Sequence, residues 1–389
     1  MPIINRIAAF HGDMTAWRRH IHAHPETAFE ERGTAAFVAG RLAEFGIEVH
    51  RGLAGTGVVG TLKVGSGPGR IGLRADMDAL HVREANGFDH RSTNEGKMHA
   101  CGHDGHTTML LGAARYLAET RRFDGTVHFI FQPAEENEGG GRVMVEQGLF
   151  EIFPVDAVYG MHNWPGLAAG RFAVRPGPMM ASSDIFEIRI TGKGAHAAMP
   201  NRGIDPIVAA AEIVGALQTV ASRQASPLES VVVSVTQFHA GDTDNVIPQQ
   251  AVLRGTTRSF LPDLRDMLEV SLRRIAEGIA AAHGASAAVT YERRYPSTIN
   301  SEKETEIAAV AMAEVAGADN VERDLAPTMG SEDFAFMLQA RPGAYVWIGN
   351  GGDAGGPGLH NPAYDFNDEI LPLGASYWAR LVERNLPAG

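Results

Sequence analysis

The order in which helices and strands are predicted constrains the fold of this chain more than any other feature of its sequence. Up to residue 177, segments with apolar residues at steps of three and four alternate with short apolar runs, which are the patterns of helices and strands. The predicted helices are 3–22, 32–45, 105–120 and 141–149, and the predicted strands are 47–51, 57–64, 70–76, 125–132 and 156–161. This alternation predicts an α/β fold, in which a mixed sheet has helices on both faces.

The pattern changes near residues 176–178, a Pro-Gly-Pro sequence. The segments that follow are strand 184–191, helix 206–222, strands 230–238 and 250–259, helix 263–283 and strand 286–293. Their order is β-α-β-β-α-β, the ferredoxin-like arrangement. The α/β pattern then resumes with helix 301–316, strand 344–349 and helix 368–385. We therefore predict a discontinuous first domain, 1–177 and 294–389, and an inserted satellite domain, 178–293.

Composition narrows the class of protein. A length of 389 residues agrees with two domains. The formal net charge is −12 and no block of lysine and arginine occurs, which argues against a nucleic-acid or anionic-membrane partner, because phosphate groups bind clustered positive charge. No apolar stretch approaches the roughly 20 residues that span a bilayer, and the N-terminus lacks a secretory pattern. With a single cysteine, the cytoplasm is the expected location.

The strongest chemical signal is the octapeptide His99-Ala-Cys-Gly-His-Asp-Gly-His, which holds the chain's only cysteine among three histidines. Thiolate, imidazole and carboxylate are ligands that divalent metals such as zinc prefer. Cys101 and His103 are separated by one residue, so in an extended backbone both side chains would project to the same side. We interpret these two as metal ligands. For His99 and His106, a capping or packing role stays open beside metal binding.

Two consecutive glutamates, Glu135 and Glu136, follow the predicted strand 125–132. Consecutive side chains cannot share one orientation, so one carboxylate can bind metal while the other faces the substrate. A glutamate that does not bind metal can act as the base that takes a proton from metal-bound water. The alternative is a solvated acidic loop that runs on to Glu138, and it loses weight beside the cysteine–histidine cluster.

Further candidates lie where predicted strands end. Asp76 ends strand 70–76, at the edge where α/β sheets bind ligands. There it either orients a metal-bound histidine or caps a turn, and for Asp78 we favour a cap. His162 and His360 each follow a predicted strand. A lone histidine is more often structural, but these two could complete a site with two metals.

Two other patterns are interpreted as structural. Residues 55–60 match G-x-G-x-x-G, but the sequence continues as a strand rather than as a helix, which disfavours a dinucleotide site. His20, His22 and His24 alternate at the end of a predicted helix, and alternation spreads them around its surface.

Together the motifs resemble those of the aminoacylase-type metallopeptidase family, over nearly the whole chain. The closest branch contains hippurate hydrolases, bacterial N-acyl-amino-acid amidohydrolases and plant indoleacetyl-amino-acid hydrolases. The matching blocks are Arg74-Ala-Asp-Met-Asp-Ala-Leu, the octapeptide at 99–106, Phe131-Gln-Pro-Ala-Glu-Glu, Gly160-Met-His-Asn, Gly192-Lys-Gly-Ala-His-Ala-Ala-Met-Pro, Met329-Gly-Ser-Glu-Asp-Phe and Leu359-His-Asn-Pro.

For the first domain, the resemblance implies a catalytic site for two divalent ions of Zn, Mn, Ni or Co. It implies that Glu135 is the general acid and base. The implied metal ligands are Cys101, His103, Glu136, His162 and His360. In the wider family an aspartate bridges the metals, and the cysteine at this position places the chain in the hippurate and indoleacetyl branch.

For the satellite domain, the resemblance implies a role in dimerisation, so a homodimer or a higher homo-oligomer formed through this domain is expected. In the wider family, a histidine matching His196 reaches the neighbouring subunit's active site and polarises the scissile carbonyl. Asn245 and Arg258 match positions that hold the substrate's carboxylate, and the backbone of Gly330 matches a further substrate contact.

These inferences predict a metal-dependent amidohydrolase that cleaves an N-acyl-amino acid into a carboxylic acid and a free amino acid. The main alternative is a dipeptidase, or another metal-dependent amide hydrolase or deaminase acting on a small carboxylate. A deaminase would not need Arg258 for a carboxylate. A non-catalytic metal-binding protein would keep the ligands but would not need Glu135.

Overall fold

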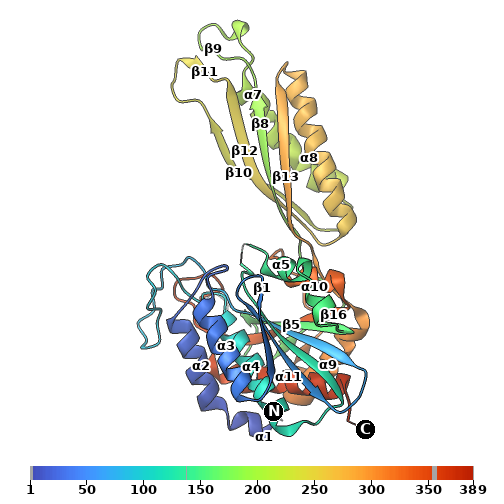
Figure 1. Ribbon diagram of the computed structural model, residues 1–389. Helices are drawn as coiled ribbons and strands as arrows, with labels where there is room; N and C mark the ends of the chain where they lie inside the picture. Colours follow the sequence, from blue (N-terminus) through green and yellow to red (C-terminus); the bar gives the residue numbers. More distant parts are fainter. Residues whose placement is uncertain (1–2, 137, 353–356, 389) are drawn as a thin grey trace. The chain divides into compact units, whose positions relative to one another are not determined.

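The computed structural model describes residues 3–136, 138–352 and 357–388. The chain forms two compact units (Figure 1). The first consists of Met1–Met179, Ile299–Ala326 and Asp333–Gly389, and the second consists of Met180–Thr298 and Pro327–Glu332. The chain passes into the second unit through β7 (Gly177–Met180) and returns through β14 (Thr298–Asn300).

An eight-stranded mixed sheet forms the centre of the first unit. Its strands, in spatial order, are β1 (Glu48–Leu53), β2 (Gly57–Val64), β4 (Gly125–Gln132), β3 (Arg70–Asp76), β5 (Ala157–Pro165), β16 (Gly343–Gly351), β6 (Phe172–Ala173) and β15 (Val321–Glu322). β3 pairs in parallel with β4 and with β5, and β5 pairs in parallel with β16. β2 pairs antiparallel with β1 on one side and with β4 on the other. The carboxyl ends of the four parallel strands therefore lie at one edge of the sheet, which is where α/β folds bind ligands.

Helices cover both faces of this sheet. They are α1 (Asn5–Ala8), α2 (His11–Ala23), α3 (Arg32–Glu44), α4 (His103–Thr120), α5 (Gly140–Glu146), α6 (Leu149–Ile152), α9 (Glu302–Ala316), α10 (Phe334–Ala340) and α11 (Leu371–Asn385). On β5, a Cβ at Gly160 would meet Phe334 of α10. The following residue of β5, Met161, lies against Gly374 of α11. Successive strand residues point to opposite faces, so α10 and α11 cover opposite faces. The predicted α/β class with a mixed sheet is confirmed.

Two predicted helices are interrupted. The helix predicted at 3–22 is broken into α1 and α2 by a tight turn, in which the N–H of Phe10 donates to the carbonyl of Ile7. This turn lets both side chains be buried. The helix predicted at 141–149 is split into α5 and α6 by Gly148, whose φ of 87° lies in the left-handed region that ends helices.

The second unit is built on a four-stranded antiparallel sheet with strand order β10-β12-β8-β13. Along the chain its main elements are β8 (Ser183–Thr191), α7 (Pro206–Thr219), β10 (Val231–Ala240), β12 (Gln250–Ser259), α8 (Pro262–Ala282) and β13 (Ser286–Tyr295). Phe186, Ile188 and Ile190 of β8 are buried in one core with Ile213 of α7 and Leu272 of α8, so both helices cover the same face of the sheet. A short ribbon pairs β9 (Ala195–His196) with β11 (Val246–Ile247).

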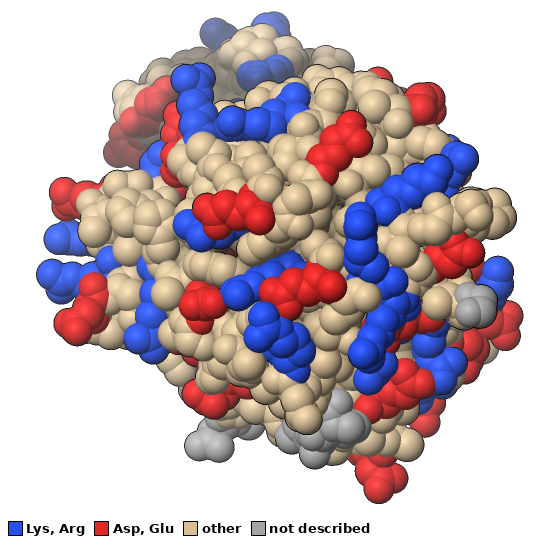
Figure 2. Space-filling view, turned by 60° about the horizontal axis from the view of Figure 1, so that its bottom comes forward, with Lys and Arg blue, Asp and Glu red and all other residues tan. Residues whose placement is uncertain are grey.

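The surface carries charges of both signs. On the face drawn in Figure 2, lysine and arginine side chains are interspersed with aspartate and glutamate side chains rather than gathered into one patch. Exposed ion pairs, such as Arg6 with Glu119, contribute little stability each. Within the described ranges, the helices are all too short or too polar to cross a membrane.

A buried polar pair joins α2 to the first turn of α4. Nδ1 of His22 donates to Oδ2 of Asp104 at 2.8 Å, and Nε2 donates to Oε1 of Glu84 at 3.2 Å. Burial lowers the pKa of His22, but the hydrogen bonds to the two carboxylates outweigh this effect and raise the pKa to about 9. His22 is therefore protonated at neutral pH, and it ties α2 to the helix that begins at His103.

We expect this pair to make the stability of the fold depend on pH. The folded-state pKa of His22, about 9, lies above its ordinary value of 6.5. The stabilisation that protonated His22 contributes is therefore complete below pH 6.5 and is lost as the pH rises through 9. The difference in free energy of unfolding between the wild type and His22→Gln should shrink by about 3 kcal/mol from about pH 6 to about pH 9.5. Urea titrations of the metal-free proteins at each pH measure this difference in free energy of unfolding. His24→Gln, at an exposed position beside the same helix, is the control, and a pH-independent difference for His22→Gln would contradict the charge assignment.

Candidate metal centre

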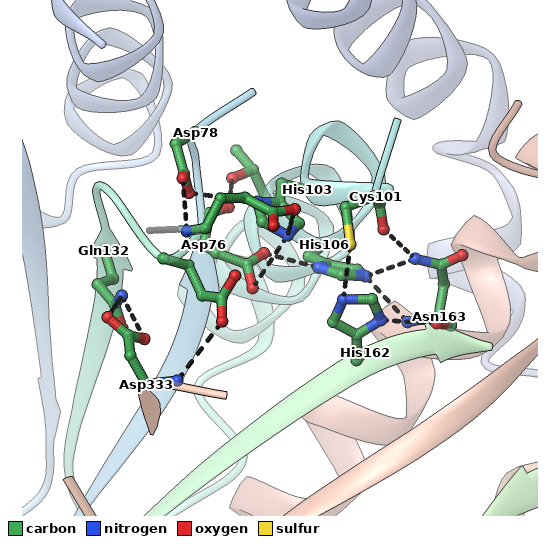
Figure 3. Close-up of polar contacts among 12 residues, drawn as sticks. Asp76, Asp78, Cys101, His103, His106, Gln132, His162, Asn163 and Asp333 are labelled. Atoms are coloured by element: carbon green, nitrogen blue, oxygen red, sulfur yellow. Dashed lines mark hydrogen bonds and ion pairs between the residues drawn. The ribbon is translucent and has the colours of Figure 1, made fainter. Parts of the chain in front are cut away.

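Most of the predicted metal and catalytic residues gather where the parallel strands of the first unit end (Figure 3). Asp76 is the last residue of β3, His162 lies near the end of β5, and α4 begins at His103. In Figure 3 the side chains of Cys101, His103 and His162 lie together on one side of this cluster. The cluster therefore occupies the carboxyl edge of the sheet.

The bend at Gly102 determines where Cys101 and His103 lie. Gly102 has a φ of 91°, and a Cβ there would lie 2.2 Å from Nδ2 of Asn163, so only glycine fits. The extended backbone assumed from the sequence is wrong, because His103 starts a helix. The side chains converge all the same: one donor atom from each of Cys101, His103 and His162 lies within 4.8 Å of the other two. Sγ of Cys101 is 3.4 Å from Nε2 of His162.

Hydrogen bonds on the Nδ1 side of two rings leave Nε2 available as a ligand atom. Nδ1 of His103 donates to Oδ1 of Asp78 at 3.2 Å, and Nδ1 of His162 donates to the carbonyl of Asn163 at 2.6 Å. Nε2 of His103 is buried and has no hydrogen-bond partner among the described residues. Buried polar atoms in that state are rare, whereas this tautomer is the one a metal-bound histidine adopts.

A second group of donors shares Cys101. Its sulfur, a carboxylate oxygen of Glu136 and a ring nitrogen of His360 lie within 4.8 Å of one another. Oε1 of Glu136 is 3.3 Å from Nε2 of His360 and 3.7 Å from Nε2 of His103. The five predicted ligands are thus brought together as two groups of three, and Cys101 belongs to both.

The contacts of Asp76, the last residue of β3, and of Asp78, just after it, differ from expectation. Asp76 accepts from Nδ1 of His106 at 2.6 Å and from Arg74 at 2.7 Å, while its contact with Nε2 of His103 is 3.8 Å long. Asp78, which we expected to be a cap, accepts from Nδ1 of His103. Asp78 is therefore the carboxylate that orients a candidate ligand, because the oxygens of Asp76 are already engaged by His106 and Arg74.

The two remaining histidines of the octapeptide lie outside the groups that share Cys101. Nδ1 of His106 donates to Asp76, and Nε2 accepts the backbone N–H of Asn163 at 2.9 Å, so both ring nitrogens are engaged. His99 is buried, and burial lowers its pKa to about 4, so its ring is neutral. Hydrogen bonding accounts for His106, whereas both ring nitrogens of His99 are buried without a hydrogen-bond partner among the described residues.

In the absence of metal, two of the candidate ligand atoms hold protons. Burial lowers the pKa of His103, but the charge of Asp76 and the hydrogen bond to Asp78 outweigh this effect and raise the pKa to about 10. Burial and the charges of the neighbouring glutamates raise the pKa of the Cys101 thiol well above its ordinary value. Both groups are protonated at neutral pH. A divalent cation that binds here must displace these protons, and it supplies the positive charge that the carboxylates attract.

The consecutive glutamates have different partners, as the sequence predicts. Oε1 of Glu135 accepts the backbone N–H of Asp333 at 3.4 Å, whereas Glu136 faces His360. A carboxylate oxygen of Glu135 also lies within 4.8 Å of donor atoms of His103 and Glu136. Glu135 therefore borders the two groups that share Cys101 without belonging to either.

Sequence reasoning missed the buried polar residues behind the cluster. Arg74 donates to Asp76 at 2.7 Å, to Gln132 at 2.8 Å and to Asp333 at 3.0 Å. Asp333 also accepts from the side chain of Gln132 and from the backbone N–H of Gly141. The sequence signal for this network was an arginine inside an otherwise apolar strand, where a buried charge must find partners.

The residues predicted to contact the substrate lie in the second unit. The N–H of Ala197 donates to the carbonyl of Asn245 at 3.0 Å, so His196 and Asn245 are neighbours on the β9–β11 ribbon. His196 is exposed. Gly330 lies in the short C-terminal segment of this unit, where its carbonyl accepts the N–H of Ala181 at 2.9 Å.

Two arginines on β12 have different surroundings. Arg254 donates to Glu187 at 2.8 Å in an exposed ion pair. Arg258 is half-buried, its Nη1 is buried with no hydrogen-bond partner among the described residues, and burial lowers its pKa. Leaving a buried guanidinium nitrogen without a partner is costly, and a carboxylate ligand would satisfy it.

Comparison with known proteins agrees with this geometry. Residues 72–384 match the family described as Peptidase family M20/M25/M40. The chain is 41% identical over 386 residues to a hippurate hydrolase of Campylobacter jejuni, covering 99% of this chain and 100% of that protein. It is 40% identical over 380 residues to an IAA-amino acid hydrolase of Arabidopsis thaliana, covering 96% and 86%. A Bacillus subtilis crystal structure, described as a dinuclear metal binding peptidase from the M20 family, has a TM-score of 0.84 at 38% identity, covering 96% and 98%.

The fold and the donor groups that share Cys101 define a metal-dependent amidohydrolase with a site for divalent ions. The chain belongs to peptidase family M20/M25/M40. The family resemblance carried by the sequence motifs is thereby confirmed.

We expect metal binding to release protons. Because Cys101 and His103 are protonated in the metal-free site, binding of Zn²⁺ near pH 7.5 should release about two protons per chain, and about one in Cys101→Ala. Calorimetric titrations in buffers of different ionisation enthalpy give this number directly. A heat of binding that does not depend on the buffer would mean that these two groups are not ligands.

Proposed function

We propose that this chain hydrolyses the amide bond of N-acyl-amino acids and releases a carboxylic acid and a free amino acid. The observation that carries the proposal is the pair of three-donor groups that share Cys101, with the carboxylate of Glu135 beside them. Two relatives at 40–41% identity are named as hydrolases of hippurate and of IAA-amino acids, and both substrates are N-acyl-amino acids.

Two divalent ions would fit the donor set. Cys101, His103 and His162 would hold one ion, and Cys101, Glu136 and His360 would hold the other. Among Zn, Mn, Ni and Co, a thiolate with several imidazoles favours zinc, cobalt or nickel over manganese. When bound, such ions would lower the pKa of water from about 15.7 toward about 7 and polarise the substrate's carbonyl group.

Glu135 would move the proton during the reaction. Its carboxylate takes a proton from the attacking water while the water oxygen forms a bond to the carbonyl carbon. It then donates this proton to the nitrogen as the C–N bond breaks, so that the amino group leaves as a neutral amine. Glu135 suits this role because it is buried beside the donor groups and the N–H of Asp333 holds one of its oxygens.

Residues of the second unit would recognise the substrate. We assign the substrate's carboxylate to Arg258, with Asn245 and the backbone of Gly330 as further contacts. The buried Nη1 of Arg258 supports this assignment, because a guanidinium binds a carboxylate through two parallel hydrogen bonds. In a homodimer formed through this unit, His196 would polarise the carbonyl in the neighbouring subunit's site. Its exposed position agrees with such a contact.

We place the enzyme in the cytoplasm, with small N-acyl-amino acids rather than nucleic acid or a membrane as its partners. Cys101 is the chain's only cysteine. A cysteine that binds metal must stay reduced, and the cytoplasm keeps thiols reduced.

The proposed base is tested by Glu135→Gln, which keeps the size of the side chain but removes proton acceptance. We expect kcat on hippurate, or on the best substrate in a panel of N-acetyl-, N-benzoyl- and indoleacetyl-amino acids, to fall by at least ~10²-fold. Metal content should be nearly unchanged, because Glu136 is the proposed ligand. Glu138→Gln, at an exposed position of the same loop, is the matched control. Near-normal turnover by Glu135→Gln would rule out this base.

The proposed carboxylate contact is tested by Arg258→Ala. Loss of a charge-assisted hydrogen bond of roughly 1.5–3 kcal/mol should lower kcat/KM about 10- to 150-fold for an N-acyl-amino acid. The loss should be small for the matching N-acyl-amino-acid amide, which lacks the charge. Arg254→Ala, on the same strand but paired with Glu187, should leave both substrates nearly unaffected. Equal losses on both substrates in Arg258→Ala would show that Arg258 supports the fold instead.

A further inference from the structure

Glu31, which lies outside the motifs that predicted the site, contacts the turn that carries Glu135 and Glu136. Its side chain is fully buried at 0% exposure. Oε1 accepts the backbone N–H of Ala134 at 2.9 Å and that of Phe29 at 3.1 Å, and Oε2 accepts the hydroxyl of Thr56 at 2.6 Å. One carboxylate thus reaches from the start of α3 to the residue immediately before Glu135.

Both backbone groups that Oε1 holds belong to strained residues. Phe29 has a φ of 60° and Ala134 has a φ of 55°, in the left-handed region that residues with a Cβ seldom adopt. Such conformations persist where the surroundings hold them, and they concentrate at functional sites. Ala134 is fully buried, so without Glu31 its N–H would lose this partner in a place that water does not reach.

Helix capping does not explain this glutamate. Glu31 is the residue before the first turn of α3, but its side chain makes no capping hydrogen bond to that helix. Burial raises the pKa of Glu31 to about 7, against the opposing effect of the Thr56 hydroxyl, so an ionised carboxylate at this position costs stability. Ionisable groups whose pKa is shifted by burial concentrate at functional sites.

The turn is held from two sides. Glu31 accepts the N–H of Ala134, and Oδ2 of Asp78 accepts the N–H of Glu136 at 3.0 Å. Glu135 lies between these two fixed points, and its own carboxylate accepts the N–H of Asp333. The direction in which each glutamate leaves the backbone therefore depends on the φ of Ala134, which Glu31 maintains.

We propose that Glu31 is a positioning residue, which holds Ala134 in the left-handed conformation and so aims Glu135 toward the reacting water and Glu136 toward the metal. The proposal rests on the roles proposed above for Glu135 and Glu136. Glu31 does not touch the substrate or the metal; it acts through the backbone of the turn.

The test compares substitutions of Glu31 on the full-length, metal-loaded protein. In Glu31→Ala the turn loses its acceptor, and kcat should fall about 10- to 100-fold, because small misplacements of reacting groups have effects of this size. KM should change less than about threefold, and the affinity for Zn²⁺ should fall, because Glu136 is carried by the same turn. In Glu31→Gln, Oε1 remains an acceptor and the amide can donate to Thr56, so kcat should stay within about threefold.

Two further variants separate positioning from folding. Thr56→Val removes the third contact of Glu31 but leaves both N–H bonds, so it should lower the melting temperature while kcat stays within about twofold. Ala134→Gly placed in the Glu31→Ala background should recover kcat several-fold, because glycine adopts a positive φ without steric strain. If Glu31→Ala does not fold, Glu31→Asp serves instead, because it keeps the charge and retracts the acceptor by one methylene.

The outcomes distinguish this proposal from the proposed function. A folded Glu31→Ala that keeps kcat within about twofold, as Thr56→Val should, or whose loss of activity follows from its lower melting temperature alone, overturns the positioning role. If Glu135→Gln is inactive in the same assay, that result leaves the proposed function intact. If Glu135→Gln turns over normally, the proposed function fails whatever Glu31→Ala does.

Discussion

Burial of negative charge is the constraint on which the site depends. A carboxylate can be buried only where N–H groups or positive charges compensate for lost water. The buried carboxylates around the metal centre include Glu31, Asp76, Asp78, Asp104, Glu135 and Asp333. Arg74 lies between two of them, His22 is bonded to a third, and backbone N–H groups satisfy others. Because hydrogen bonds are directional, the same contacts that make burial possible also determine where rings and turns lie.

Asp78 illustrates how one carboxylate can couple two elements. Oδ1 accepts from Nδ1 of His103 at the start of α4, and Oδ2 accepts the N–H of Glu136 in the turn after β4. Two candidate ligands from distant segments are thereby held in one arrangement before any metal binds. Partners of this kind orient the ligands and tune the metal. On the other side of the same turn, Glu31 accepts the backbone N–H of Ala134, the residue before Glu135.

The two units have different tasks in the proposed enzyme. The first would contribute the metal ligands and the base from the carboxyl edge of a parallel set of strands, where several side chains can converge. The second contributes the residues that would recognise the substrate, on an antiparallel sheet covered by α7 and α8. In the proposed reaction the metal ions would act on the amide group, whereas recognition of the substrate's carboxylate would depend on Arg258 and its neighbours. Changes in the second unit can therefore alter selectivity without disturbing the buried charges of the first.

The element types, the mixed α/β class and the set of candidate metal-binding side chains could be predicted from the sequence, because hydrophobic periodicity and donor chemistry are local properties. The sequence also predicted different roles for Glu135 and Glu136, since consecutive side chains diverge. Three features appear only in the folded chain: Asp78 rather than Asp76 orients His103, both nitrogens of His106 are engaged, and Glu31 accepts the N–H of Ala134. These features are hydrogen bonds between residues that lie up to about a hundred positions apart in the sequence. They depend on directions and distances that exist only once the strands pair and the helices pack, so no local pattern encodes them.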